Sequence, residues 1–399
     1  MPANTNTYRR RGRTKISAED VKKMKPPIIK LRRGDIDYTF LFMVVLVLSV
    51  GLVMLLSASA PSAKRIYDNS YYFFFKQGAC AVIGLVGMFI ISNMNYASYK
   101  KYVPMALVIC TVALVLVLLP VTGVSLNGSR RWLNTPVVQL QPSEFMKPII
   151  AMYFALMIER GKYDLKTIRG VAPFAGVMLV VLGLMLMETH LSGAIVIAGI
   201  GLVVMIAGGV PVKPIIFGGL IIMVVGVFAV RSFSEVRWNR IMSFLDPFAD
   251  PQRTGYQISQ GLYAIGSGKL FGLGLGQSIQ KYTYLPEPYN DFIFAVVCEE
   301  LGLVGATCII ILFAALILRA ARIASTAPDL YSSLVATGIT AHLAIQIVLN
   351  IAVATSSVPN TGVSLPFFSY GGTSIITLLL EMGVLLNISR YSIKPNSKR

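Results

Sequence analysis

Asp291 has the residue type and the position of a general base. It follows the segment YLPEPYN and directly precedes the apolar run FIFAVV. At the start of a membrane helix it would lie at the water boundary, where partial dehydration raises the pKa of a carboxyl group toward a range useful for proton transfer. The competing interpretation is a helix N-cap, because Asp commonly precedes a helical apolar run. The two roles are compatible.

Three further acids lie near Asp291 in the sequence. Glu287 precedes it by four residues, while Glu299 and Glu300 lie about two helical turns after it. Ionisable side chains at membrane depth are costly, and they usually face the bundle interior or a cavity. A structural pair and a substrate contact are equally compatible with Glu299 and Glu300.

A second chemical segment begins at Arg130-Arg131-Trp132 and continues to Lys147. Arginine forks suit phosphate oxygens, and Trp132 could stack on a sugar or simply anchor the chain at the lipid headgroups. Ser143 is placed to cap the helix that follows Pro142. Glu144 and Lys147 are spaced i, i+3, so they share a helix face and can pair.

Apolar helices must position these residues. The 399-residue chain is 55% hydrophobic and only 14% charged, with a mean hydropathy of +0.68. A span needs about 20 apolar residues, and the sequence predicts an all-α polytopic membrane protein with about ten spans. The predicted spans are 38–58, 72–92, 103–120, 144–159, 171–188, 190–208, 213–231, 291–318, 331–354 and 367–388.

The basic residues predict the orientation of these spans. Eleven Lys and Arg precede residue 37, and the predicted inner connections carry Lys or Arg, as the positive-inside rule expects. We therefore expect residues 1–37 to form a disordered cytoplasmic tail, 38–392 a ten-helix membrane domain, and 393–399 a cytoplasmic C-terminal tail. The net charge of +18 then reflects topology rather than nucleic-acid binding.

Three predicted outer loops carry the chemical segments. The loop 121–143 contains the Arg-Arg-Trp run, and 353–374 leads into the last span. Between helices 7 and 8, residues 232–290 form a large extracytoplasmic loop, rich in Gly, Pro and aromatic residues, which we expect to be an ordered cap with short interfacial helices. Its basic residues indicate an anionic ligand or outer-leaflet headgroups; they are Arg237, Arg240, Arg253, Lys269 and Lys281.

Other motifs are excluded. The glycines at 266–276 lack the strand–helix context of a dinucleotide site and indicate tight turns instead. His190 and His342 have no spacing suited to metal ligation, so neither is assigned a role. The four cysteines lie in apolar blocks with no CxxC pair, which excludes disulfide and zinc frameworks.

Seven motifs together resemble the SEDS family (shape, elongation, division and sporulation). They span most of residues 38–392, and the chain is more similar to the FtsW/SpoVE branch than to the RodA relatives. The motifs are NGSRRW (127–132), QPSEFMK (141–147), GLGLGQS (272–278), QKYTYLPE (280–287), DFIFA (291–295), EELG (299–302) and LPFFSYGG (365–372).

The resemblance implies a peptidoglycan glycosyltransferase. Such an enzyme polymerises the lipid-linked disaccharide lipid II into glycan strands at the outer face of the bacterial plasma (inner) membrane, here in cell division, with both termini cytoplasmic. It implies a complex with a class B penicillin-binding protein (a transpeptidase) and other divisome proteins. The family's essential carboxylate falls on Asp291. The predicted substrate-binding residues are Arg130, Arg131, Trp132, Glu144, Lys147, Lys281, Glu287 and Ser369.

The expected mechanism joins two loops over one cavity. Asp291 takes a proton from a sugar hydroxyl of the acceptor lipid II, and the oxygen attacks the anomeric carbon of the donor strand. Arg131, Lys147 and Lys281 are candidates to stabilise charge on the leaving undecaprenyl pyrophosphate. A divalent cation, Mg²⁺ or Mn²⁺, could share this work. One departure is His190, which stands where many relatives carry an acid in a Pro-Asp-Leu-Gly-Thr stretch.

Two rival functions remain. A lipid II flippase would use Glu144, Lys147, Glu299 and Glu300 as a polar path through the membrane. A division scaffold without catalysis would use the basic tail for recruitment. The flippase is disfavoured by the concentration of distinctive residues on one predicted face, and the scaffold leaves the outer-face motifs without a role.

Overall fold

The structure is a computed structural model. It describes residues 34–120, 122–126, 129–133, 139–215, 218–219, 244–250 and 255–391. The elements are α2 (Tyr38–Tyr67), α3 (Tyr72–Asn93), α4 (Tyr96–Lys100), α5 (Val103–Leu118), β1 (Gly123–Leu126), β2 (Ser129–Leu133), α6 (Pro142–Glu159), α7 (Ile168–Met187), α8 (Leu191–Ala207), α11 (Tyr256–Ser267), α12 (Gln280–Thr283), α13 (Ile293–Ser325), α14 (Leu330–Ala354) and α15 (Gly372–Ser389).

The described helices confirm an all-α polytopic membrane protein. Within the described ranges, α2, α3, α7, α13, α14 and α15 are long and apolar enough to cross a bilayer, and α5 and α8 are shorter apolar helices. α6 has 18 residues but carries Glu144 and Lys147 on its buried side. Nine of the predicted blocks thus coincide with helices. Most of the tenth, 213–231, lies outside the described residues, so the count of ten stays a prediction. The predicted tails, 1–37 and 393–399, also lie mostly outside the described residues and stay predictions.

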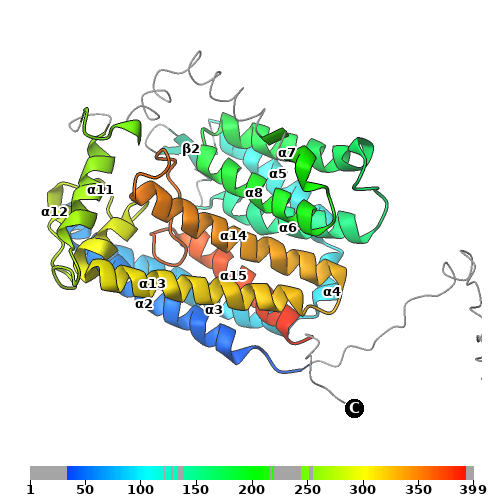
Figure 1. Cartoon of the computed structure of the whole chain (residues 1–399), viewed down its shortest axis with the longest axis horizontal. Coiled ribbons are helices and arrows are strands. Elements are labelled where there is room, and N and C mark those ends of the chain that lie inside the picture. Colours follow the sequence, from blue (N-terminus) through cyan, green and yellow to red (C-terminus); the bar gives the residue numbers. More distant parts are fainter. Residues whose placement is uncertain are drawn as a thin grey trace, which may run out of the picture. The chain divides into compact units, whose positions relative to one another are not determined.

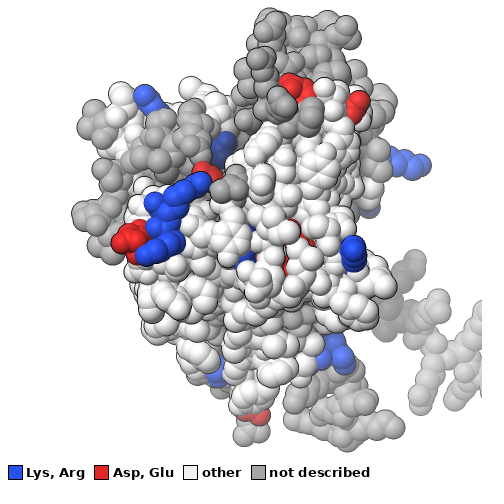
Figure 2. Space-filling view, turned by 90° about the vertical axis from the view of Figure 1, so that its left-hand side faces the viewer, with Lys and Arg blue, Asp and Glu red and all other residues white. Residues whose placement is uncertain are grey.

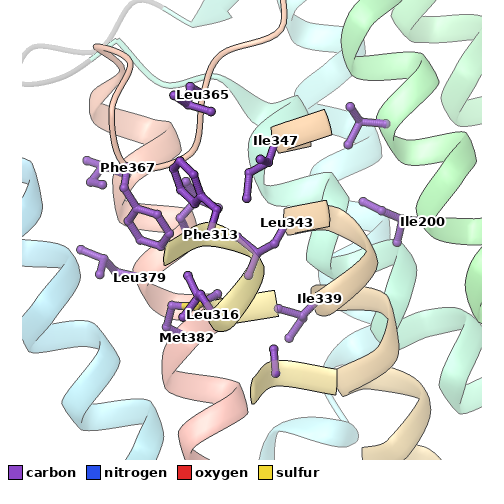
Figure 3. Packing of buried hydrophobic residues seen from close by; sticks show 14 of the residues in the cluster. Ile200, Phe313, Leu316, Ile339, Leu343, Ile347, Leu365, Phe367, Leu379 and Met382 are labelled. Carbon is purple, nitrogen blue, oxygen red and sulfur yellow. The ribbon is translucent and has the colours of Figure 1, made fainter. Parts of the chain in front are cut away.

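α14 lies at the centre of the packing. It contacts α6, α8 and α13, and Figure 1 shows it beside α13 and α15, with α6 and α8 along its other side. Figure 3 shows Leu343 and Ile347 of α14 meeting Phe313 and Leu316 of α13. α3 packs along α15 at close range, because Gly383 of α15 leaves room for the backbone of Met88. Small residues permit such close contacts where lipid provides no hydrophobic drive for helix association.

The chemical segments gather at one end of the bundle. β1 and β2 form an antiparallel hairpin in which Val124 pairs with Trp132. α11 and α12 lie at the same end in Figure 1 and fall within the predicted loop 232–290. Residues 232–243 and 251–254, with Arg237, Arg240 and Arg253, lie outside the described part, so the extent of that loop stays a prediction.

Two capping interpretations were wrong. The N-cap of α13 is Phe292, so Asp291 lies one residue before it and is free of a capping role. The N-cap of α6 is Gln141, which places Ser143 inside the first turn. Asp37 is a true cap: it caps α2 and also accepts hydrogen bonds of 2.7 and 2.9 Å from Arg319 of α13.

Candidate active site

Asp291 is half-buried at the entry to α13. The pKa of its carboxyl group is raised from 3.8 to about 6, mainly by burial and also by the negative charge of Glu287, against the opposing positive charge of Arg131. A carboxylate with a pKa near 6 is mostly ionised at neutral pH yet holds a proton better than an ordinary Asp does. This is the property that a general base requires.

Glu287 and Arg131 are the charged neighbours that the structure brings to Asp291. Glu287 is exposed, has a φ of +46°, and accepts a hydrogen bond of 2.9 Å from the Asn290 side chain. Arg131 lies on β2 and donates a 2.8 Å hydrogen bond to the carbonyl of Thr189, between α7 and α8. Arg131 of β2 therefore lies near enough to Asp291 for its charge to lower the pKa of that carboxyl group. The joint role of the two segments in the reaction stays a prediction.

A buried acid, Glu188, also feels the charge of Arg131. Glu188 is 1% exposed, and within the described residues neither carboxylate oxygen has a hydrogen-bond partner. Burial raises its pKa to about 8, against the opposing charge of Arg131. Burial and the same arginine lower the pKa of His190 to about 3, so that histidine is neutral. The sequence prediction missed Glu188; its only signal was its place beside the departure at His190.

Glu144 and Lys147 pair as their spacing predicted. Their side chains are buried and 2.7 Å apart, and Lys147 also lies 3.4 Å from the side-chain oxygen of Gln346. The same Gln346 oxygen accepts a 2.6 Å hydrogen bond from Nε2 of His342. The other ring nitrogen of His342, Nδ1, lies 2.8 Å from a carboxylate oxygen of Glu381. His342, which was assigned no role, therefore links α14 to α15 inside the bundle.

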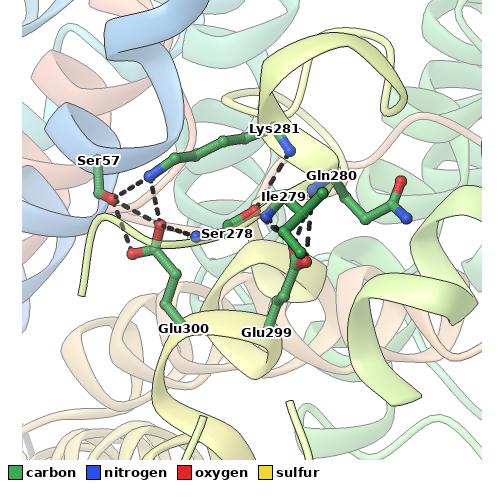
Figure 4. A network of polar contacts seen from close by, with 7 residues as sticks. All are labelled: Ser57, Ser278, Ile279, Gln280, Lys281, Glu299 and Glu300. Atoms are coloured by element: carbon green, nitrogen blue, oxygen red, sulfur yellow. Dashed lines mark hydrogen bonds and ion pairs between the residues drawn. The ribbon is translucent and has the colours of Figure 1, made fainter. Parts of the chain in front are cut away.

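Lys281 lies in a different network, shown in Figure 4. Its ammonium group is 2.6 Å from Glu300 and 3.1 Å from the hydroxyl of Ser57 on α2. Glu299 accepts hydrogen bonds from Ser278 (2.5 Å) and the amide of Ile279 (3.0 Å). The structural alternative for Glu299 and Glu300 is therefore observed, and the charge of Lys281 is already compensated by Glu300.

The remaining predicted residues differ in their surroundings. Ser369 is buried, donates a 2.8 Å hydrogen bond to the Asn290 carbonyl and accepts one of 2.7 Å from the Leu365 amide. It thus fastens the loop before α15 next to Asp291. Trp132 is half-buried and Arg130 is exposed on the hairpin.

Figure 2 looks onto the end of the molecule that carries α11 and α12. Uncharged atoms cover most of this face, Lys and Arg gather on one side of it, and charged atoms near the middle are visible only between uncharged ones. No group of three His, Cys, Asp or Glu side chains converges to hold a metal ion in the part of the chain that the structure describes. The possible divalent cation stays a prediction, and the described groups that could take part in chemistry here include the Asp291 carboxylate and the Arg131 cation.

Comparisons with known proteins agree on one family. The FtsW/RodA/SpoVE model, described as a cell cycle protein, matches residues 38–394. Stage V sporulation protein E of Bacillus subtilis is 43% identical over 357 residues, covering 89% of this chain and 97% of that protein. A probable peptidoglycan glycosyltransferase FtsW of Trichlorobacter lovleyi is 38% identical, covering 90% and 94%.

Solved structures give the same result. A chain from a study of how a peptidoglycan synthase complex coordinates polymerization and crosslinking matches with a TM-score of 0.77 and 27% identity, covering 89% of this chain and 98% of that chain. The rod shape determining protein RodA of Thermus thermophilus matches with a TM-score of 0.67 and 26% identity, covering 90% and 98%.

Proposed function

From the premise that this chain belongs to the FtsW/RodA/SpoVE family, we propose that it is a peptidoglycan glycosyltransferase that polymerises lipid II in cell division. Relatives that it covers almost completely are named probable peptidoglycan glycosyltransferases. The observation that carries the proposal is Asp291, a half-buried carboxylate with a pKa near 6 and an arginine beside it. The site thus offers a base to accept the hydroxyl proton and a cation to stabilise the pyrophosphate that leaves, which are the two groups that this glycosyl transfer needs.

Asp291 acts as the general base. Its carboxylate accepts the proton of a sugar hydroxyl on the acceptor lipid II as that oxygen forms a bond to the anomeric carbon of the donor strand. The bond from the same carbon to the lipid pyrophosphate breaks, and the pyrophosphate leaves with the electron pair. Positioned general bases contribute about 10²- to 10⁴-fold to such a step.

Arg131 is the cation best placed to stabilise the leaving pyrophosphate. It acts electrostatically on Asp291, and an arginine fork matches phosphate oxygens. Arg130 is exposed beside it. Lys147 and Lys281 are each paired with a buried glutamate, so a direct role for either would require that pair to open. Trp132, Glu287 and Ser369 complete the proposed substrate-binding set, with Ser369 acting through the loop that it fastens.

The proposed partner is a class B penicillin-binding protein. The similar chain of TM-score 0.77 comes from a synthase complex that coordinates polymerization and crosslinking. A polymerase that releases strands beside a transpeptidase would deliver its product directly to the crosslinking site. Other divisome proteins are proposed as further partners from the relatives named FtsW.

The chain is a multi-pass membrane protein, and we place it in the bacterial plasma membrane with both termini in the cytoplasm. The supporting observation is the run of eleven Lys and Arg before residue 37. The lipid tails of both substrates then stay in the bilayer while Asp291 works at its outer surface.

The rival function, a lipid II flippase, is disfavoured because charged side chains of its supposed polar path are already held in ion pairs. Glu144 bonds to Lys147, and Glu300 bonds to Lys281. The experiment supplies purified full-length protein with lipid II, with and without a cognate class B synthase, and looks for glycan strands. Transfer of labelled lipid II across vesicles without any polymer would favour the flippase and contradict the proposal.

A further inference from the structure

Three buried polar side chains lie along one face of α14. His342, Gln346 and Asn350 are spaced i, i+4 and i+8, and each is at most 1% exposed. A buried amide is costly unless its hydrogens are bonded. His342 and Gln346 bond to each other, and Gln346 also donates to the carbonyl and hydroxyl of Ser364 at 3.0 and 2.9 Å. The face of α14 thus holds the loop before α15.

Asn350 connects this face to the site. Its side-chain nitrogen donates two hydrogen bonds, one of 2.8 Å to the carbonyl of Asp291 and one of 2.7 Å to the carbonyl of Val363. One amide group therefore ties the residue before α13 and the loop before α15 to the same point on α14. Asn350 is fully buried.

The loop held by Asn350 also lies against the Asp291 side chain. Gly362 directly precedes Val363 and has a φ of +71°, and a methyl group at Gly362 would lie 3.1 Å from Oδ2 of Asp291. Asn350 therefore fixes both the backbone that carries the carboxylate and the wall beside it.

We propose that Asn350 is a positioning residue for Asp291, holding the carboxylate at the orientation and degree of burial that the transfer reaction needs. The proposal rests on the proposed glycosyltransferase function and adds to it a residue that touches no substrate. A displacement of about 1 Å at a reacting group can cost about 100-fold in rate, so a tether at this point can set the rate from outside the site.

The acidic limb of the pH–rate profile tests this positioning, because the limb follows the pKa of Asp291 and that pKa depends on how deeply the carboxylate is buried. The charged groups that act on Asp291 are Glu287, from the segment before α13, and Arg131, from β2. Burial is the largest cause of its raised pKa. If the tether is lost, water reaches the carboxylate and its pKa falls, so the acidic limb moves to lower pH. A variant that only loses stability lowers the amount of folded enzyme but leaves the pKa of Asp291 in the folded enzyme unchanged.

The test compares Asn350→Leu with Asn387→Leu in the full-length protein together with its class B synthase. Asn387 is a matched control because it is also fully buried and its side chain donates to the carbonyls of Ile91, Ser92 and Met94, between α15 and α3. Polymerisation of lipid II is measured as kcat and KM across the range from about pH 5 to about pH 8. Leucine has the same number and branching of side-chain heavy atoms as asparagine but no hydrogen-bonding group, and its extra volume is common to both variants.

For Asn350→Leu we expect kcat to fall about 10-fold or more, KM to change little, and the acidic limb to move down by about half a pH unit. Asn387→Leu should keep the wild-type limb. A second variant covers the case in which Asn350→Leu does not fold: Gly362→Ala places a methyl group against Oδ2, excludes water, and should move the limb to higher pH.

The outcomes separate the two claims. Wild-type protein that makes no polymer would overturn the proposed function and this proposal with it. Wild-type protein that polymerises, with Asn350→Leu and Gly362→Ala both keeping the wild-type limb, would overturn only the positioning role of Asn350.

Discussion

At the scale of single residues, the sequence pattern identified the proposed base, Asp291, but not the residues that hold it in place. Asp291 was predictable because an acid before an apolar run is visible in one dimension, and the Glu144–Lys147 pair followed from i, i+3 spacing. Asn350 and Glu188 could not be predicted. Their importance depends on neighbours about 60 residues away in the chain, Asp291 and Arg131 respectively.

Glu188 gives a prediction about stability and pH. Its pKa in the folded protein, about 8, lies above its ordinary value of 4.5. The folded state therefore binds this proton more tightly than the unfolded state does, so the stabilisation is complete below about pH 4 and is lost as the pH rises toward about 8. Glu188→Gln, which stays neutral, should unfold about 2–4 °C higher than wild type at pH 8 and should match it at low pH.

Thermal unfolding in detergent checks this, with Glu287→Gln as the control because that carboxylate is exposed. Parallel curves of Tm against pH for wild type and Glu188→Gln would show that Glu188 is already ionised in the folded protein.

At the scale of elements, the apolar blocks predicted most helix ends in the described parts of the chain to within three residues, because a membrane helix is recognisable by its length and hydropathy. The exceptions are α2 and α13, which extend nine and seven residues beyond their predicted ends, and α15, which begins five residues later than predicted. The sequence did not show that α13 is interrupted. Gly302 has a φ of +66° and a ψ of −171° inside that helix. Residues 268–276, here called the glycine strap, bond to the helix backbone at the break, with Leu303 donating to Lys269 (2.9 Å) and Gly274 donating to Glu300 (3.0 Å).

Gly302→Ala should therefore be strongly destabilising. A methyl group there would lie 2.3 Å from the amide nitrogen of Gly272, in a backbone conformation that costs a non-glycine residue about 1–3 kcal/mol before any clash is counted. Gly183→Ala in α7 is the control, because its added methyl group meets no atom within 4 Å and alanine is the better helix former. Equal thermal stability of the two variants would contradict the close strap contact.

The Lys281–Glu300 pair distinguishes a structural lysine from a substrate-binding one. Lys281→Met leaves Glu300 charged and buried, which costs about 3–5 kcal/mol when one partner of a buried pair is removed. Adding Glu300→Gln removes that charge. If Lys281 serves α2–α13 packing, the double variant regains stability and polymerisation. Recovery of stability without recovery of polymerisation would instead indicate that Lys281 stabilises the leaving pyrophosphate, as the sequence analysis predicts.

At the scale of the whole molecule, the bundle places the described residues of the candidate active site at one end, and the central helix α14 contacts them. α14 contacts α6, α8 and α13 and carries the polar face that reaches Lys147 and Asp291. Family membership and an all-helical membrane fold could be predicted from motifs and hydropathy. The contact of β2 with the corner between α7 and α8 could not, because the hydrogen bond from Arg131 to the carbonyl of Thr189 joins residues that are 58 positions apart in the chain.

The central claim is that Asp291 is the base of a glycan polymerase. The most direct test is the rate of lipid II polymerisation by purified Asp291→Asn protein, in complex with its synthase and with wild-type thermal stability. Asparagine keeps the shape of aspartate but cannot accept the proton, so the account predicts a loss of about 100-fold or more. Polymerisation by a folded Asp291→Asn protein at the wild-type rate would contradict it.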